Sequence, residues 1–197
     1  MSISFSIFFT LLFLISSCAN YRTPYETPSS PVKQEYKEIS LPFKTGTKFK
    51  VSQGAFGKKS HSEPGNEYSW DFDVPYGTSV LAIEAGRVIG VWEPNLGGVC
   101  NESFKANAHN IKIEHSDGTV AQYVHIKSRV QVGDLIKKRQ VIATTSQNGF
   151  ICQPHLHLGV YQSRKHLYHS PGRKTLPLFF RGLPEGQARD GATYEVR

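Results

Sequence analysis

After residue 18 the sequence is a series of short β-type runs separated by turns, and this pattern constrains the fold more than any other feature. Residues 110–114 alternate apolar and polar side chains with the period of two that a half-buried strand requires. Asp117-Gly118 follows, and residues 119–126 complete a predicted hairpin, because Asp-Gly supplies the positive φ angles of a tight turn. Further strands are expected at 79–82, 87–91, 130–134, 140–143, 155–161 and 176–180. Since no long stretch has the 3.6-residue apolar period of a helix, the sequence predicts a mainly β fold of antiparallel sheets.

Composition agrees with a single folded domain. The chain has 197 residues, 39% hydrophobic and 20% charged, which is enough apolar material for a core and excludes wholesale disorder. Its 17 glycines and 12% aromatic residues, against a single methionine, favour a turn-rich β protein over a helical bundle. The only long apolar run lies at the start and is too short to span a bilayer, which excludes a polytopic membrane protein.

The first residues have the features of an export signal. Residues 1–17 contain no charged side chain and are apolar from Phe5 to Ile15, the size of a signal peptide. The following Cys18 completes a sequence that resembles the lipobox of bacterial lipoproteins. We expect cleavage before Cys18, lipidation of its thiol, and a periplasmic protein anchored by lipid to the outer membrane, since Ala19 is not the aspartate associated with inner-membrane retention. A plain signal peptide or an uncleaved anchor are the alternatives.

The rest of the chain divides into a tether and a folded domain. Residues 18–40 are rich in Pro, Ser and Thr with balanced charge, which predicts a flexible tether. Residues 41–197 form the predicted domain, with a core at about 50–162 and a C-terminal extension at 163–197. The net charge of +7 lies on residues 39–197 and suits an anionic partner such as cell-wall polymer or lipid headgroups. Nucleic acid is not expected as a partner of an exported chain.

Two cysteines remain after Cys18. An oxidising compartment favours a disulfide between Cys100 and Cys152, and the alternative is two separate buried thiols. A cysteine zinc site is not expected, because the sequence has no Cys-x-x-Cys pair.

Histidines supply the candidate chemistry. His155 and His157 lie two apart in a predicted strand, so both imidazoles should face the same side of a sheet. They could share a metal, or one could bind metal while the other acts on a substrate. One aspartate and two histidines would be suitable zinc ligands and would leave a fourth position for water. The neighbouring Asp73 is interpreted as a hydrogen-bonding partner rather than a ligand.

Several motifs together resemble the lysostaphin/LytM-type zinc endopeptidases, which cut peptide cross-links in bacterial peptidoglycan. The motifs are Ser60-His61, Asp71-Phe-Asp-Val-Pro-Tyr-Gly-Thr, Glu84-Ala-Gly-Arg-Val, Asn110-Ile-Lys-Ile-Glu-His, Tyr123-Val-His125, Val132-Gly-Asp134, Asn148-Gly149 and Pro154-His-Leu-His157. The resemblance implies a duplicated hybrid motif, or barrel-sandwich-like LytM fold, whose antiparallel sheets form a groove. It also implies one zinc ion per chain. The implied metal ligands are His61, Asp71 and His157, and the implied catalytic histidines are His125 and His155.

The sequence departs from the family pattern at its first ligand. Ten residues separate His61 from Asp71, whereas the founding pattern places the two ligands four residues apart. The resemblance implies a zinc-dependent endopeptidase acting on cross-links or stem peptides of peptidoglycan. A LytM-like lipoprotein without activity, which activates separate cell-wall amidases, is the alternative. A third alternative is a phosphotransfer module of related β fold. Phosphotransfer of this kind is cytoplasmic, which does not agree with an export signal.

Overall fold

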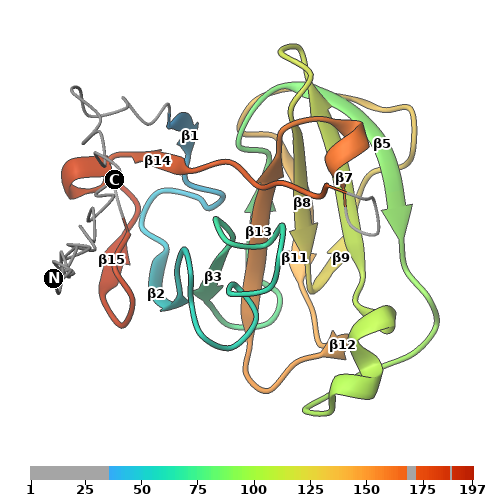
Figure 1. Cartoon of the computed structure of the whole chain (residues 1–197). Helices are drawn as coiled ribbons and strands as arrows, with labels where there is room; N and C mark the ends of the chain where they lie inside the picture. The colour runs from blue at the N-terminus through green and yellow to red at the C-terminus, as the bar shows by residue number, and fades with distance from the viewer. Residues whose placement is uncertain (1–35, 168–171, 187) are drawn as a thin grey trace, which may run out of the picture. The chain divides into compact units, whose positions relative to one another are not determined.

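The computed structural model describes residues 36–167, 172–186 and 188–197 (Figure 1). The predicted signal peptide, Cys18 and most of the predicted tether lie outside these residues. The strands are β1 (Lys37–Ser40), β2 (Lys48–Gln53), β3 (Trp70–Asp73), β4 (Ser79–Leu81), β5 (Gly86–Trp92), β6 (Gly98–Val99), β7 (Asn110–His115), β8 (Val120–Val124), β9 (Ile126–Ser128), β10 (Leu135–Ile136), β11 (Val141–Thr145), β12 (Gly149–Phe150), β13 (His155–Tyr161), β14 (Leu178–Arg181) and β15 (Thr193–Glu195). Three short 3-10 helices are η1 (Glu102–Asn107), η2 (Arg164–His166) and η3 (Pro184–Gly186).

One large antiparallel sheet organises the fold. Its 8 strands follow the order β10-β5-β7-β8-β13-β3-β2-β15. A second sheet has 3 antiparallel strands in the order β4-β11-β9. Figure 1 shows β13 between β8 and β3, near the middle of the large sheet. The prediction of a mainly β fold with antiparallel sheets is therefore confirmed. Two small pairs, β1 with β14 and β12 with β6, are parallel and were not predicted.

The register of the large sheet places two of the predicted metal ligands, Asp71 and His157, directly opposite each other on neighbouring strands. His157 on β13 lies opposite Asp71 on one side and Val124 on the other. Directly paired residues project to the same face of a sheet, so we call the side of the sheet that carries Asp71 and His157 the metal face.

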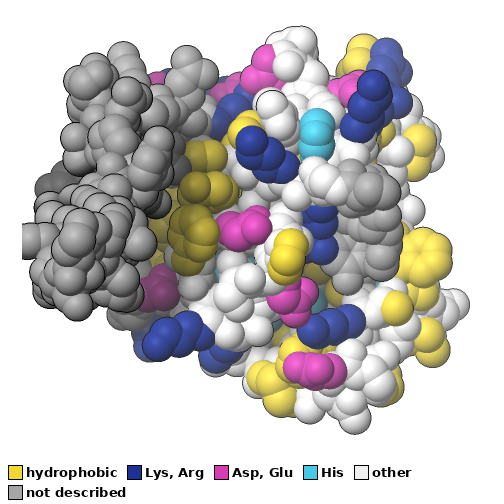
Figure 2. Space-filling model, viewed as in Figure 1, with side chains coloured by type: hydrophobic (Ala, Val, Ile, Leu, Met, Phe, Trp, Pro, Cys, Tyr) yellow, Lys and Arg dark blue, Asp and Glu magenta, His cyan; other side chains and the backbone are white. Residues whose placement is uncertain are grey.

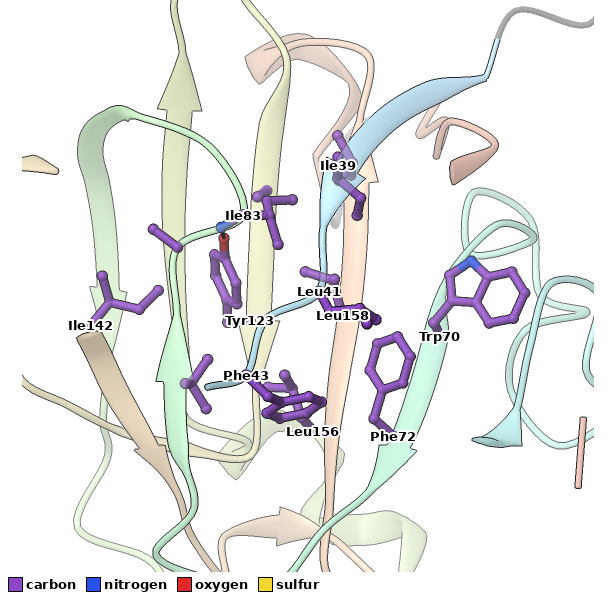
Figure 3. Close-up of a cluster of buried hydrophobic side chains, with 14 of the residues drawn as sticks. Ile39, Leu41, Phe43, Trp70, Phe72, Ile83, Tyr123, Ile142, Leu156 and Leu158 are labelled. Carbon is purple, nitrogen blue, oxygen red and sulfur yellow. Dashed lines mark hydrogen bonds between the residues drawn. The ribbon is translucent and has the colours of Figure 1, made fainter. Parts of the chain in front are cut away.

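The opposite side of the sheet carries the core. Leu156, Leu158 and Phe72 alternate with the metal-face residues of β13 and β3, and all three are fully buried. Figure 3 shows them with Phe43 and Tyr123 in one apolar cluster. The hydroxyl oxygen of Tyr123 accepts a hydrogen bond from the Ile83 amide, which satisfies the one polar group of this large buried side chain.

Three expectations about individual segments need correction. Residues 130–134 form a turn, not a strand, because Gly133 takes a positive φ of 99° and the Asp134 side chain accepts from the Gln131 amide. In the 117–118 turn only Gly118 has a positive φ, since Asp117 instead accepts hydrogen bonds from Thr119. The last four residues of the predicted tether are strand β1, because Ile39 is buried in the core and the strand pairs with β14.

Charge is mixed over the visible surface. On the face shown in Figure 2, Lys and Arg side chains are interspersed with Asp and Glu, and neither sign gathers into one broad patch on that face. Among the described residues, no helix has the length and apolar character needed to cross a membrane.

Candidate metal centre

Three side chains from distant parts of the chain converge on the metal face. His61 Nε2 lies 3.3 Å from Asp71 Oδ1 and 3.3 Å from His157 Nδ1. His157 Nδ1 lies 2.8 Å from the same Asp71 oxygen. The three residues predicted as metal ligands are therefore brought together, although ten and eighty-six positions separate them from Asp71 along the sequence.

Asp71 and His157 meet because β3 and β13 are paired with these two residues in register. His61 reaches them from the loop between β2 and β3, where it is fully buried. Its Nδ1 lies 2.8 Å from the carbonyl oxygen of Gly54, which can only accept a hydrogen bond. Nδ1 therefore carries the hydrogen, and Nε2 presents a bare lone pair to Asp71 and His157.

Gln53, the last residue of β2, holds this loop to the site with both ends of its amide. Its oxygen accepts from the amides of Lys59 (2.8 Å) and Ser60 (3.1 Å). Its nitrogen donates to Asp71 Oδ2 at 2.9 Å and to the Ser60 hydroxyl at 2.9 Å. One buried side chain therefore orients Asp71 and fixes the backbone directly before His61.

The electrostatics keep the aspartate ionised. Burial opposes ionisation of Asp71, but its contacts with His157 and His61 outweigh burial and hold its pKa well below the usual value. Burial lowers the pKa of His157, although Asp71 opposes that shift. The cluster therefore combines a carboxylate with one imidazole, that of His157, whose burial favours the neutral, metal-binding form.

The donor set fits zinc. Two neutral imidazoles and one carboxylate are common zinc ligands, and a fourth position stays open for water or substrate. Ligand atoms about 2.0–2.1 Å from one tetrahedral ion stand about 3.3 Å apart, which matches the two separations from His61 Nε2. Asp71 Oδ1 and His157 Nδ1 are closer, at the hydrogen-bond distance of 2.8 Å. In the neutral ring His61 Nε2 is an acceptor like Asp71 Oδ1, so their approach to 3.3 Å is favourable when a metal ion or a proton lies between them. The convergence of one donor atom from each of the three residues is the observation that most directly indicates a metal.

His125 reaches the metal face through an unusual backbone conformation. Val124 faces His157, so strict alternation would turn the next side chain towards the core. His125 instead has a φ of 62°, in the left-handed region that histidine seldom occupies. Here the chain leaves the large sheet and enters β9 of the 3-stranded sheet. The turn brings the His125 ring to a centroid distance of 4.5 Å from His155.

The two predicted catalytic histidines have the same tautomer. His125 Nδ1 lies 2.9 Å from the carbonyl oxygen of Asn148, and His155 Nδ1 lies 2.8 Å from that of Gln153. Both Nδ1 atoms therefore donate, and both Nε2 atoms are bare acceptors in the neutral rings. Burial lowers the pKa of His125 to about 3, which keeps this ring neutral near neutral pH.

A segment beside these histidines is held by a disulfide and a parallel strand pair. Cys100 and Cys152 are bonded, which confirms the predicted pairing. Gly149 pairs with Gly98 and has a φ of 69°. A Cβ at Gly149 would stand 2.5 Å from Cα of Ala108, so only glycine allows this close approach of β12 to the preceding segment.

Sequence reasoning missed the residues that orient the site. Gln53 gave no signal, because its role depends on the loop that folds back onto it. Asn148 appeared only as part of an Asn-Gly motif, but its side chain also accepts from the His109 amide and donates to the Ile126 carbonyl. Asp73 accepts a hydrogen bond from Gln153, in agreement with its interpretation as a hydrogen-bonding partner.

Known proteins share part of this chain. The glycyl-glycine endopeptidase ALE-1 of Staphylococcus capitis is 35% identical over 95 residues, which are 47% of this chain and 24% of that protein. Lysostaphin of Staphylococcus simulans is 34% identical over 95 residues, 47% of this chain and 17% of that protein. The chain thus matches about a quarter or less of the length of these relatives. A solved zinc-containing peptidase from Vibrio cholerae superposes with a TM-score of 0.49 at 23% identity, covering 72% of this chain and 39% of that one.

A family match covers the site itself. The profile of peptidase family M23 matches residues 65–169, which is more than half of the chain. Asp71, His125, His155 and His157 lie within this range, and His61 lies four residues before it. The chain belongs to peptidase family M23.

Proposed function

We propose that this protein is a zinc-dependent endopeptidase that hydrolyses peptide bonds in the cross-links or stem peptides of bacterial peptidoglycan. The observation that carries the proposal is the convergence of His61, Asp71 and His157 beside two further histidines whose Nε2 atoms are free to accept a proton. Family membership and the similarity to a glycyl-glycine endopeptidase and to lysostaphin support the reaction class and the substrate.

The residues divide into a metal-holding and a proton-transferring group. His61, Asp71 and His157 would hold the zinc ion, which when bound acts as a Lewis acid toward the scissile carbonyl. In their neutral forms, His125 and His155 each offer Nε2 to a proton of the attacking water, while the carbonyls of Asn148 and Gln153 hold both rings in that tautomer. A ring protonated in this way becomes a donor and can return the proton to the leaving amine.

We further propose that the enzyme is exported and held by lipid on Cys18 at the periplasmic face of the outer membrane. The uncharged apolar start and the lipobox-like sequence support this location. A diacylglycerol plus an N-acyl chain gives lasting attachment, whereas a single chain binds only marginally. Residues between Cys18 and β1 would then carry the peptidase domain away from the membrane.

Digestion of purified peptidoglycan tests the proposal. The zinc-loaded protein is expected to release soluble peptides, and release should stop after a chelator removes the metal and resume when zinc is restored. His157→Ala should lose both stoichiometric zinc and peptide release, because one of three ligands is gone. His166→Ala is a matched control, since that histidine lies in η2, outside the cluster.

Two outcomes would contradict the proposal. Equal peptide release by wild type and His157→Ala would show that the cluster is not the active site. No release of peptides by the zinc-loaded protein would also contradict it. Failure to bind stoichiometric zinc would favour the alternative, a LytM-like protein with a dead site that activates separate amidases.

A further inference from the structure

Lys112 is a charged side chain on the metal face that the proposed mechanism does not use. On β7 it lies opposite Gln122 of β8, and Gln122 lies opposite Gly159 of β13. This row is next to the one containing His157, because Gly159 is two residues further along the same strand. Figure 1 shows β7, β8 and β13 side by side in the large sheet. Lys112 therefore projects from the same side of the sheet as the metal ligands.

Lys112 keeps an uncompensated charge. Its side chain makes no hydrogen bond or ion pair within the described part of the chain, and the residue is half-buried. Burial lowers its pKa, and no carboxylate opposes that shift. Glu114 lies two residues further along β7 on the same face, but Arg164 already binds both of its oxygens, with Nη2 2.6 Å from Oε2. An ammonium group that is partly desolvated and unpaired favours binding an anion.

The side chain of Lys112 leans toward β5. Its stem lies over Gly90, where an added Cβ would stand 3.5 Å from the lysine Cδ. The neighbouring Gln122 also has no side-chain hydrogen bond within the described residues, so its amide adds a second unpartnered polar group. A cation beside an amide can bind a carboxylate through charge-assisted hydrogen bonds.

We propose that Lys112, with Gln122 beside it, binds a carboxylate of the substrate, so that the enzyme selects acidic peptides. This inference rests on the proposed peptidase function and names its substrate class. Two strand spacings and one two-residue step separate Lys112 from His157, which is about 12 Å between Cα atoms. An extended peptide advances about 3.3 Å per residue, and the Lys112 stem leans over β5, away from β13. The recognised carboxylate therefore lies about four or more residues from the cleaved bond.

Matched synthetic peptides test this assignment. In a series of peptides that the wild-type holoenzyme cleaves, each position is occupied in turn by Glu or by Gln, which differ in charge but not in shape. We expect one position where the Glu peptide has a kcat/KM about 10- to 100-fold higher, the range of a charge-assisted hydrogen bond. Lys112→Met should reduce this ratio to about one and leave cleavage of the Gln peptide unchanged. Lys112→Arg should retain the preference.

The controls separate recognition from folding and from catalysis. Lys44→Met removes an exposed lysine in the turn before β2 and should keep the wild-type ratio. Thermal unfolding of each variant shows whether the fold is intact. Cleavage without any preference for Glu, or a preference that persists in Lys112→Met, overturns this inference and leaves the proposed function standing. Equal loss of both peptides in folded Lys112→Met also overturns it, while no cleavage of any peptide by wild type overturns both.

Discussion

At the scale of single residues, the candidate metal centre depends on one amide side chain as much as on its ligands. Gln53 donates to Asp71 and accepts from the backbone before His61. Groups that orient metal ligands typically contribute a factor of 10 to 100 in metal affinity, because they fix the ligand geometry before the metal binds.

Replacement of Gln53 by leucine should therefore weaken zinc binding by roughly 10- to 100-fold. Leucine has a similar size but can neither donate to Asp71 nor accept from the loop, so both ligands lose their support. Competition against a chromophoric chelator measures the affinity. Gln131→Leu, at an exposed turn position, is the control and should bind zinc as the wild type does. Equal affinity of the two variants would show that Gln53 does not orient the site.

The direction of the His125 side chain could not be predicted from its position in the strand. Alternation along β8 places Tyr123 in the core and Val124 on the metal face, so His125 should have pointed inward. Its left-handed backbone turns the ring to His155 instead. Residues held in such conformations gather at functional sites, where the surrounding structure supports them. Here hydrogen bonds of the His125 backbone to His109 and Ser146 supply that support.

At the scale of elements, strand pairing assembles the site and a cross-link holds the segment beside it. β13 carries His155 and His157, two predicted site residues, on one face, and its register with β3 places Asp71 opposite His157. The segment containing β6 and η1 contacts β12 through the Gly98–Gly149 pair and the Cys100–Cys152 bond. The disulfide closes a sequence separation of 52 residues.

The double variant Cys100→Ser/Cys152→Ser should have a free energy of unfolding lower by up to about 4 kcal/mol, the loss that the chain-entropy treatment gives for a loop of this length. Denaturant titration measures the change. A reducing agent should lower the stability of the wild type by a similar amount and leave the double variant unchanged. If reduced wild type and variant unfold at the same denaturant concentration as the oxidised protein, the bond does not stabilise the fold.

At the scale of the whole molecule, a buried histidine away from the metal centre connects stability to pH. His115, at the end of β7, lies on the core face and is 5% exposed. Its Nδ1 contacts the Thr119 hydroxyl at 2.9 Å, and its buried Nε2 has no partner among the described residues. A second proton would therefore have no acceptor. Burial, helped by the positive charge of Lys37, lowers the pKa of His115 to about 4.

Protonation of His115 should destabilise the fold as the pH falls. In the unfolded chain the group titrates near its ordinary 6.5, so below that pH the unfolded state binds a proton that the folded state rejects, until about pH 4. Between pH 7.5 and 4.5 the metal-free wild type should lose about 2–3 kcal/mol more stability than metal-free His115→Leu. Denaturant titrations at both pH values measure this. Parallel losses in the two chains would show that His115 is not the responsible group.

The sequence was sufficient where the determining interactions are local. Period-two patterns identified the strands around 110–126 and 155–161, and the same period placed His155 and His157 on one face. The turn at 130–134 and strand β1 were assigned wrongly, because the first contains strand-like residues in a turn and the second becomes a strand only by pairing with β14. The mainly β architecture therefore followed from local pattern, and its sheet connections did not.

The tertiary structure decided what depends on residues far apart in the chain. The resemblance to a family named His61 as a ligand, but a ten-residue loop has many conformations, and only the contacts with Gln53 and Gly54 select the one that reaches Asp71. The direction of His125, the uncompensated charge of Lys112 and the buried position of His115 likewise depend on non-local packing. Strand periodicity is a property of neighbouring residues, whereas side-chain convergence is fixed only when strands and loops meet in the folded chain.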